Sequence, residues 1–348
     1  MSVTTAPSTQ HKPTNSARHD VREVRAAWIQ AARLRTLPLA ASGSCIAAGI
    51  ATLHGAFRPS VFALMFIVSM LLQIIANFAD DYGDLSHGLD DETRVGPHRG
   101  MQRGIITPRQ MRRALTALCA LTFILGCALI AVSFAGGPAM DGDAWLAVVS
   151  FVALGVASIA AAVLYTVGPH PYGYLGLGDI MSALFFGVVA VVGGSFLYLH
   201  QFSGIAVLAG VALGLPVATV MNINNMRDST ADAAKGKRTI ANRLYALGAA
   251  RADHKVGDAE RGGERAMRLY HRVLISCSLG LFVLAVICTG GLLPLRLAIL
   301  CLAFFPLLHA TNGVCHQLDH TKLDRFMAPT SMGTVLVALG VTVCLLLA

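Results

Sequence analysis

Apolar runs of bilayer-spanning length are the feature of this sequence that most restricts its fold. About 20 apolar residues in a helix cross the hydrocarbon core of a membrane, and the chain of 348 residues contains nine runs close to that length. They occupy residues 37–53, 61–78, 114–134, 144–167, 180–199, 204–221, 273–290, 292–311 and 329–347. The sequence therefore predicts an all-α integral membrane protein built as a nine-transmembrane-helix bundle.

The division between the seventh and eighth runs rests on a short break. Only Gly290, Gly291 and Pro294 separate them, so eight or ten spans remain alternatives. Residues 1–20 are polar and rich in Ser, Thr and Pro, which predicts a disordered tail in front of a single membrane domain at 21–348. The first run lacks a small-residue cleavage site and is read as a span rather than a signal peptide.

The composition agrees with a membrane protein and argues against a nucleic-acid partner. Charged residues make up 13% of the chain, whereas soluble domains carry roughly 25%. The net charge of +8 arises from short blocks between apolar runs rather than from one basic face. Lipid and phosphate groups are the expected partners. The eight cysteines lie mostly inside apolar runs and are interpreted as small buried hydrophobes.

The basic residues are distributed on one side of the predicted bundle. Of the 27 Lys and Arg residues, 25 lie in the N-terminal segment or in loops at about 79–113, 222–272 and 312–328, and only Arg58 and Arg296 lie opposite. Basic residues near helix ends remain cytoplasmic. The N-terminus and these loops, together with the loop at about 165–179, are therefore predicted to be cytoplasmic.

An acidic cluster ends the second apolar run. Asp81 and Asp84 are three residues apart and share one helix face, with Asn77 and Asp80 one turn below. Carboxylates at a membrane-embedded helix end are costly and are rarely kept without a partner. Several basic residues and glycines follow, which favours a binding site over a solvated polar cap. The basic residues are Arg94, Arg99 and Arg103.

A second acidic cluster repeats this arrangement at the end of the sixth run. Asp228 and Asp232 are four residues apart and again face one way. Asn222, Asn224 and Asn225 precede them, and Lys235, Lys237 and Arg238 follow. Mg²⁺ takes oxygen ligands and is commonly held by one or two carboxylates plus substrate phosphates. Two such clusters that face each other are suited to hold a diphosphate between metal ions.

The loop between the fourth and fifth runs is rich in residues that form ordered turns. Its sequence, YTVGPHPYGYLGLGDI at 165–180, contains four glycines, two prolines and three tyrosines. Tyr165 and Tyr172 are candidates for substrate binding, although an aromatic belt at the membrane interface is the alternative.

These segments resemble the UbiA superfamily of intramembrane prenyltransferases, and within it the 1,4-dihydroxy-2-naphthoate polyprenyltransferases of menaquinone biosynthesis. The resemblance covers most of residues 30–245. Its motifs are ARLRTLPLA (32–40), DDYGDLSHGLD (80–90), RVGPHRGMQRGIIT (94–107), YTVGPHPYGYLGLGDI (165–180) and NINNMRDSTADAAKGKRT (222–239). It implies transfer of a long prenyl chain from polyprenyl diphosphate to an aromatic acid, with loss of the carboxylate, in a bacterial cytoplasmic (inner) membrane.

The resemblance also implies roles for individual residues. Asp81 and Asp84 bind one Mg²⁺ and Asp228 and Asp232 another, and these four form the catalytic centre. The residues expected to bind substrate are Asn77, Asp80, Arg94, Arg99, Gln102, Tyr165, Tyr172, Asn225, Arg227, Lys235, Lys237 and Arg238.

The sequence departs from the family pattern in three places. Asp80 stands where the family usually has Asn, and His170 stands where a basic residue usually precedes the proline of the middle loop. The charged stretch HKVGDAERGGERA at 254–266 is an insertion, which is predicted to be a surface loop. Two alternatives remain: a superfamily member with another acceptor, such as 4-hydroxybenzoate, homogentisate, haem or chlorophyllide, and a membrane transporter.

Overall fold

The computed structural model describes residues 20–88, 98–135, 142–252, 257–291 and 293–348. Within these ranges every regular element is a helix, which confirms the all-α prediction. The first half contains α1 (Val21–Ala32), α2 (Leu37–Leu53), α3 (Pro59–Ser86), α4 (Pro108–Phe134), α5 (Gly142–Leu164), η1 (Tyr172–Leu175), α6 (Gly178–Ser182), η2 (Ala183–Gly193) and α7 (Gly194–Leu199). The second half contains α8 (Gly204–Arg227), α9 (Ser229–Ala234), α10 (Ile240–Ala250), α11 (Asp258–Cys288), α12 (Pro294–His316), η3 (His320–Phe326) and α13 (Met327–Leu346).

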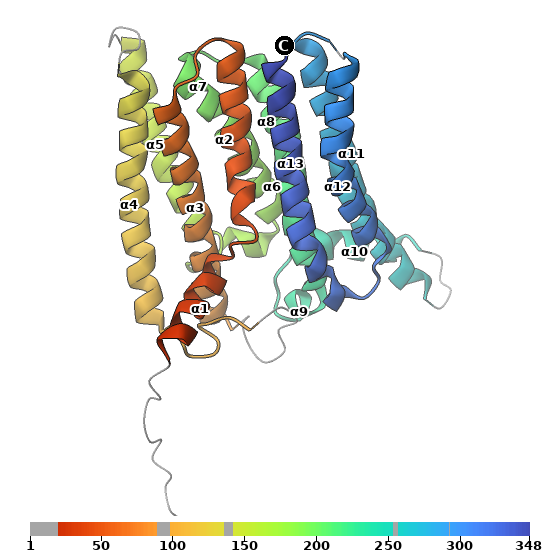
Figure 1. Ribbon diagram of the computed structural model, residues 1–348. Helices are drawn as coiled ribbons and strands as arrows, with labels where there is room; N and C mark the ends of the chain where they lie inside the picture. The colour runs from red at the N-terminus through yellow and green to blue at the C-terminus, as the bar shows by residue number, and fades with distance from the viewer. Residues whose placement is uncertain (1–19, 89–97, 136–141, 253–256, 292) are drawn as a thin grey trace, which may run out of the picture.

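The long helices form an up-and-down bundle of bilayer-spanning length (Figure 1). Among the described residues, eight helices are long and apolar enough to cross a membrane. A ninth span results when α1 and α2, which are bent by 46° at a short break, are counted as one broken span. The predicted nine-helix bundle is confirmed. The short α1 and α9 lie at its lower end in Figure 1.

Several helices extend beyond the apolar runs that predicted them. α3 continues to Ser86 and carries its aspartates in helical backbone, and α4 begins at Pro108, six residues before its run. The start of α4 is encoded locally: Thr107 caps the helix, Pro108 fills the first turn, and Gln110 completes a capping box. Hydropathy marks only the part of a helix that lipid surrounds, whereas backbone hydrogen bonds continue past the interface.

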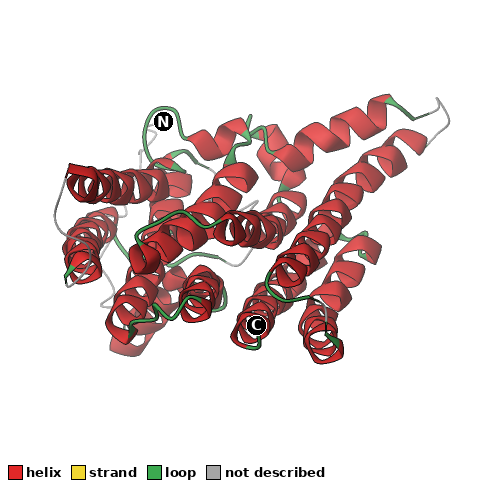
Figure 2. Ribbon diagram, turned by 90° about the horizontal axis from the view of Figure 1, so that it is seen from above, coloured by secondary structure: helices red, strands yellow, loops and turns green. Residues whose placement is uncertain are grey.

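The prediction of a surface loop at 254–266 is wrong for its described part. Residues 254–256 lie outside the described residues, but α11 begins at Asp258 and runs without a break into the membrane span. The reason is its contact with α10. An added Cβ at Gly262 would lie 2.4 Å from the carbonyl oxygen of Gly248, so these two helices touch backbone to backbone. The hairpin that α10 and α11 form together extends to one side of the bundle in Figure 2.

Glycines also set the closest packing inside the bundle. The span that contains α6, η2 and α7 lies directly against α8, and an added Cβ at Gly187 would lie 2.5 Å from the carbonyl oxygen of Gly210. η2 is a π-helix of eleven residues. π-helical turns are rare and are often found at functional sites. Here the π-helix supplies residues to the main cavity described below.

The cysteines are less buried than predicted. Cys315 and Cys344 are buried, but Cys277, Cys288 and Cys301 are exposed on the outer surface of α11 and α12. On membrane-spanning helices an outward apolar side chain faces lipid, so these thiols need no protein core around them.

Candidate functional site

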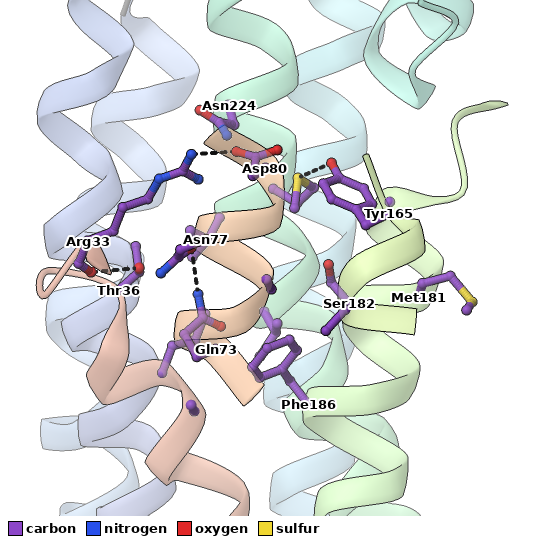
Figure 3. Close-up of a pocket in the computed structure, with 18 of the residues that line it drawn as sticks. Arg33, Thr36, Gln73, Asn77, Asp80, Tyr165, Met181, Ser182, Phe186 and Asn224 are labelled. Atoms are coloured by element: carbon purple, nitrogen blue, oxygen red, sulfur yellow. Dashed lines mark hydrogen bonds and ion pairs between the residues drawn. The ribbon is translucent and has the colours of Figure 1, made fainter. Parts of the chain in front are cut away.

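A cavity of about 630 Å³ opens between the helices at the end of the bundle where α3 and α8 terminate. Both acidic clusters line it, together with residues of the α1–α2 break, α5, η2 and α9. Figure 3 shows part of this lining, with Arg33 from the break, Asp80 from α3 and Phe186 from η2. Its charged residues lie at this end, and the apolar side chains Phe185, Phe186 and Val189 line the part that continues into the bundle. The cavity therefore joins a charged mouth to an apolar interior.

The first acidic cluster is gathered around one buried guanidinium. Arg99 is 7% exposed, and its Nη2 lies 3.0 Å from Asp80 Oδ2. Its Nε lies 3.2 Å from Asp81 Oδ1, and its Nη1 lies 3.1 Å from Asp84 Oδ2. One guanidinium from the loop after α3 thus forms ion pairs with three carboxylates on the last turns of the helix.

Arg33 is a second cation on this cluster, and sequence analysis did not assign it a role. Its Nη2 donates to Asp81 Oδ1 at 2.9 Å and also contacts Asp80 (Figure 3). Arg33 ends α1 with a left-handed backbone, φ 50°. That conformation is uncommon for a residue with a side chain, and it lies at the bend between α1 and α2. The sequence signal was present in the ARLRTLPLA motif, but its distance from the aspartates concealed the contact.

The middle loop packs directly against the aspartate-bearing end of α3. An added Cβ at Gly83 would lie 2.3 Å from the carbonyl oxygen of Thr166, and Thr166 Oγ1 donates to the carbonyl oxygen of Ala79 at 2.8 Å. Tyr174 Oη donates to Asp84 Oδ1 at 3.1 Å. Burial and the neighbouring Asp84 carboxylate raise the pKa of Tyr174, so the phenol remains a proton donor to this carboxylate.

The second acidic cluster has its own cations. Arg227 binds Asp228 through two parallel contacts, Nε to Oδ1 at 2.9 Å and Nη2 to Oδ2 at 2.6 Å. Its Nη1 donates to Asp324 Oδ1 at 2.6 Å, which links α8 to η3. Lys237 Nζ lies 3.3 Å from Asp232 Oδ2. Burial raises the pKa of Asp232 to about 6.

Lys237 lies between the two clusters. Burial by itself would lower the pKa of Lys237, but the carboxylates of Asp232, Asp84, Asp80 and Asp228 outweigh it and raise the pKa. Its ammonium also lies 5.7 Å from the centre of the Tyr174 ring. Because residues from both clusters act on this one cation, the two helix ends form a single electrostatic site.

Two of the three tyrosines of the middle loop face the cavity rather than an interfacial belt. Tyr165 and Tyr172 both line it, with ring centres 5.4 Å apart. Tyr172 Oη donates to the carbonyl oxygen of Ala161 at 2.7 Å, and burial raises the pKa of Tyr172 to about 12. Asn225 Nδ2 donates to the buried Asp179 Oδ1 at 2.9 Å. Asp179 therefore positions Asn225, a second role that sequence analysis did not assign.

The structure brings most of the predicted site residues together. Those that line the cavity are Asn77, Asp80, Asp81, Asp84, Arg99, Tyr165, Tyr172, Asn225, Arg227, Asp228, Asp232, Lys235 and Lys237. Gln102 and Arg238 are not among the lining residues. Gln102 Oε1 instead accepts from the backbone N–H of Arg99, and Arg238 is exposed. Arg94 lies outside the described residues.

The two single-residue departures from the family pattern lie in different surroundings. Asp80 is held by Arg33 and Arg99, so its extra charge is balanced by cations within the cluster. His170 is exposed and is not a lining residue of the cavity.

The donor set of the site fits a hard divalent cation. The four predicted ligands are carboxylates, and Mg²⁺ prefers oxygen ligands. Across the described ranges no group of three or more Asp, Glu, His or Cys side chains is arranged as a complete metal cage. Mg²⁺ is usually bound by one or two carboxylates with substrate phosphates and waters as the remaining ligands. The two pairs of aspartates match that incomplete coordination.

Comparison with known proteins gives one family. The UbiA prenyltransferase family matches residues 41–327. The 1,4-dihydroxy-2-naphthoate octaprenyltransferase of Escherichia coli (strain K12) is 42% identical over 65% of this chain and 70% of its own length. The protein of the same name from Haemophilus influenzae (strain ATCC 51907 / DSM 11121 / KW20 / Rd) is 34% identical over 89% of this chain and 92% of its own length.

A solved structure has the same fold. It comes from a study of the biosynthesis of digeranylgeranylglyceryl phosphate synthase in membranes. The two chains superpose with a TM-score of 0.51 at 14% identity, over 94% of this chain and all of the other. At this identity the likeness extends to the arrangement of helices only.

Proposed function

This chain belongs to the UbiA prenyltransferase family, and from that premise we propose that it transfers a long polyprenyl chain from polyprenyl diphosphate to 1,4-dihydroxy-2-naphthoate. The product, after loss of CO₂, is demethylmenaquinol, the reduced form of demethylmenaquinone, which places the reaction in menaquinone biosynthesis. Curated relatives with the octaprenyltransferase name support this acceptor and align with most of the chain. The family also favours a transferase over a transporter.

The observation that carries the proposal is the single cavity that joins both acidic clusters to an apolar interior. A prenyl diphosphate has the complementary division, with a highly charged head and a hydrocarbon tail. We assign Asp81 and Asp84 to one Mg²⁺ and Asp228 and Asp232 to another. When bound, Mg²⁺ would neutralise the negative charge that develops on the diphosphate as it leaves.

The cationic side chains act on the same leaving group. Arg99, Lys235 and Lys237 line the charged mouth of the cavity. They would stabilise the diphosphate as the allylic C–O bond breaks and the electron pair departs with oxygen. Arg33 and Arg227 also line the mouth and belong to this group by their contacts with the aspartates. Asp80 belongs to the first cluster, and Asn77 Nδ2 donates to the carbonyl oxygen of Ala32 at 2.9 Å, which holds α3 against the end of α1.

The acceptor ring would bind where the charged mouth meets the apolar part. Tyr165, Tyr172 and Asn225 line this region, and the apolar helices around it keep water from the allylic cation. The electron-rich naphthol ring then forms the new C–C bond at the carbon that carries the carboxylate. CO₂ leaves from that carbon, and its bonding electrons restore aromaticity, so no proton has to be removed there.

We place the enzyme in the bacterial cytoplasmic membrane, with the N-terminus and the site facing the cytoplasm. The 25 basic residues on that side support this orientation. Both acidic clusters end their helices on the same side, so one orientation serves both of them. Water-soluble acceptor and Mg²⁺ would then enter from the cytoplasm while the prenyl chain enters from the bilayer.

The test is a transfer assay in membranes that contain the protein. Octaprenyl diphosphate and Mg²⁺ are supplied with either 1,4-dihydroxy-2-naphthoate or 4-hydroxybenzoate, and the lipid product is identified by mass spectrometry. We expect a prenylated naphthoquinol that has lost its carboxylate, formed in strong preference to prenylated hydroxybenzoate. A product that retains its carboxylate, or a preference for hydroxybenzoate, would refute the acceptor assignment.

A further inference from the structure

Asp324, on the segment between α12 and α13, contacts two arginines of the charged mouth. It belongs to η3, which precedes α13 at the lower end of the bundle in Figure 1, the end that also carries α1 and α9. Arg35 and Arg227 line the cavity, whereas Asp324 is not among its lining residues. Any effect of Asp324 on the site therefore passes through these two arginines.

Arg35 binds Asp324 through two parallel contacts. Its Nη1 donates to Asp324 Oδ2 at 2.8 Å and its Nη2 donates to Oδ1 at 3.1 Å. A bidentate pair of this kind fixes the plane of the guanidinium as well as its distance from the carboxylate. Arg35 lies in the break between α1 and α2, close to Arg33, which binds the first acidic cluster. The contact therefore ties this break to η3, 289 residues further along the chain.

The same carboxylate also holds Arg227, a cation of the second acidic cluster. Arg227 Nη1 donates to Asp324 Oδ1 at 2.6 Å, while its Nε and Nη2 bind Asp228. The Arg227 side chain is 3% exposed, and hydrogen bonds are electrostatically stronger in such buried surroundings than in water. Arg227 therefore has one carboxylate partner among the expected metal ligands and one partner outside them.

One carboxylate thus holds two guanidinium groups at the charged mouth. Two cations close together repel each other, and an arginine side chain loses rotamer entropy when it is fixed in one position. Asp324 offsets the repulsion and orders both groups in advance. A diphosphate that binds there meets donors that are already in place, and such preorganisation lowers the cost of binding.

η3 has anchors that do not involve Asp324. Leu323 is fully buried in the core of the bundle. The ring of Phe326 covers Gly313 of α12, where an added Cβ would lie 2.3 Å from Phe326 Cε1. These apolar contacts flank Asp324 in the sequence, so η3 should stay folded when the charge of Asp324 is removed.

From these contacts we infer that Asp324 is a positioning residue for the diphosphate head of the substrate. By holding Arg35 and Arg227 together, it joins the α1–α2 break to the end of α8 at the charged mouth. This inference rests on the proposed function and adds to it. It gives a residue of η3 a role in substrate affinity that it performs through the two arginines.

The test variants separate charge from size. Asp324→Asn keeps the size of the side chain and removes its charge, whereas Asp324→Glu keeps the charge. Asp319→Asn is the matched control in the same segment. The Asp319 side chain accepts from the backbone N–H of Thr321 at 3.0 Å and pairs with Lys322 rather than with a cavity arginine. The control therefore removes the same charge and weakens the start of η3 without touching Arg35 or Arg227.

The first experiment measures binding without turnover. Farnesyl diphosphate is titrated calorimetrically into each detergent-solubilised protein in the presence of Mg²⁺ and without an aromatic acceptor. We expect Asp324→Asn to raise the Kd at least about tenfold, or about 1.4 kcal/mol. Asp324→Glu should recover most of the affinity, and Asp319→Asn should bind like the wild type. An unchanged Kd for Asp324→Asn, or an equal loss for Asp319→Asn, would overturn the inference.

The second experiment separates the diphosphate from the acceptor. We expect Asp324→Asn to raise the KM for octaprenyl diphosphate about tenfold and to leave the KM for 1,4-dihydroxy-2-naphthoate nearly unchanged. A general loss of packing would instead weaken both substrates or lower kcat alone. Equal increases in both KM values, or a decrease confined to kcat, would therefore contradict the positioning role.

A third variant breaks the same ion pair from its more exposed end. The Arg35 side chain is 39% exposed, so Arg35→Gln can be measured even if Asp324→Asn is not recovered from membranes. Arg35→Gln should raise the Kd for farnesyl diphosphate, and an unchanged Kd would overturn the inference. Combined with Asp324→Asn, it should raise the Kd by less than the product of the two single effects, because residues in contact are not independent. Fully multiplicative losses would show that Asp324 does not act through Arg35.

The two proposals fail in different ways. If the wild-type protein neither binds nor transfers a prenyl diphosphate, the proposed function is wrong. If the wild-type protein does both and Asp324→Asn behaves like Asp319→Asn, only the positioning role is wrong.

Discussion

Gly83 lies between Asp81 and Asp84 on α3, and its replacement by alanine tests how tightly the site depends on the middle loop. The substitution adds one methyl group. That methyl would lie 2.3 Å from the carbonyl oxygen of Thr166 and 2.6 Å from the Thr166 Cβ. The first of these neighbours is backbone, which cannot rotate away as the end of a flexible side chain does.

The magnitude follows from the distance that has to be gained. Ordinary contacts of a Cβ begin at 3.4 Å, so α3 and the loop must separate by about 1 Å. Misplacement by 1 Å at an active site costs roughly 100-fold in rate, or about 2.7 kcal/mol of barrier. The effect on folding is smaller, because overpacking costs about 1–3 kcal/mol and alanine in a helix regains about 1 kcal/mol relative to glycine.

The assay measures prenyl transfer per amount of folded protein in membranes, together with the thermal unfolding midpoint in detergent. We expect Gly83→Ala to lose about 100-fold in kcat with a modest decrease in Tm. Gly280→Ala is the control, since its methyl meets no atom within 4 Å. It should keep full activity. If Gly83→Ala retained more than a tenth of the wild-type rate, the contact between α3 and the loop would not hold the aspartates in place.

Four further predictions concern the charges of the site and the orientation of the chain. Asp81→Asn and Asp228→Asn should each remove nearly all turnover. The membrane yield should stay normal, because the arginines that bind these aspartates keep other carboxylate partners. Activity above about a tenth of wild type, a barrier increase below about 1.4 kcal/mol, would contradict their assignment as Mg²⁺ ligands. Removing divalent cations with EDTA should abolish transfer and added Mg²⁺ should restore it, whereas activity that survives chelation would refute metal dependence. Lys237→Met should lower kcat more than tenfold, about 1.4 kcal/mol, since both clusters lose their shared cation, and an unchanged kcat would argue against that sharing. A reporter active only outside the cytoplasm should be active when fused after Asp143 and silent after Arg251, and the reverse pattern would invert the orientation.

The sequence by itself determined the elements that depend on local physics. The bilayer thickness fixes how many apolar residues form a span, so the runs predicted the helices of the bundle, and the α2 prediction at 37–53 coincides with Leu37–Leu53. The spacing of Asp81 and Asp84 placed them on one face of a helix. Their repetition at Asp228 and Asp232 identified both sides of the site before any contact was known.

Sequence reasoning was less accurate where a helix extends beyond its hydrophobic segment. The insertion at 254–266 looked like a loop because it is charged and contains glycines. Those glycines instead allow α11 to approach α10, with Gly262 against Gly248. Composition shows that a segment is polar, but it does not show whether another helix lies close enough to order it.

Only the tertiary structure decided which side chains meet. Arg33 is 47 residues from Asp80 in the sequence and binds it, and Tyr174 is 90 residues from Asp84 and donates to it. Gln102, close to Arg99 in sequence, stabilises that loop rather than lining the cavity. Helix formation depends on neighbours within one turn, whereas these contacts depend on how far each helix is shifted and rotated against the next. The bundle sets those positions through close glycine contacts such as Gly83 with Thr166, and the sequence gives no direct measure of them.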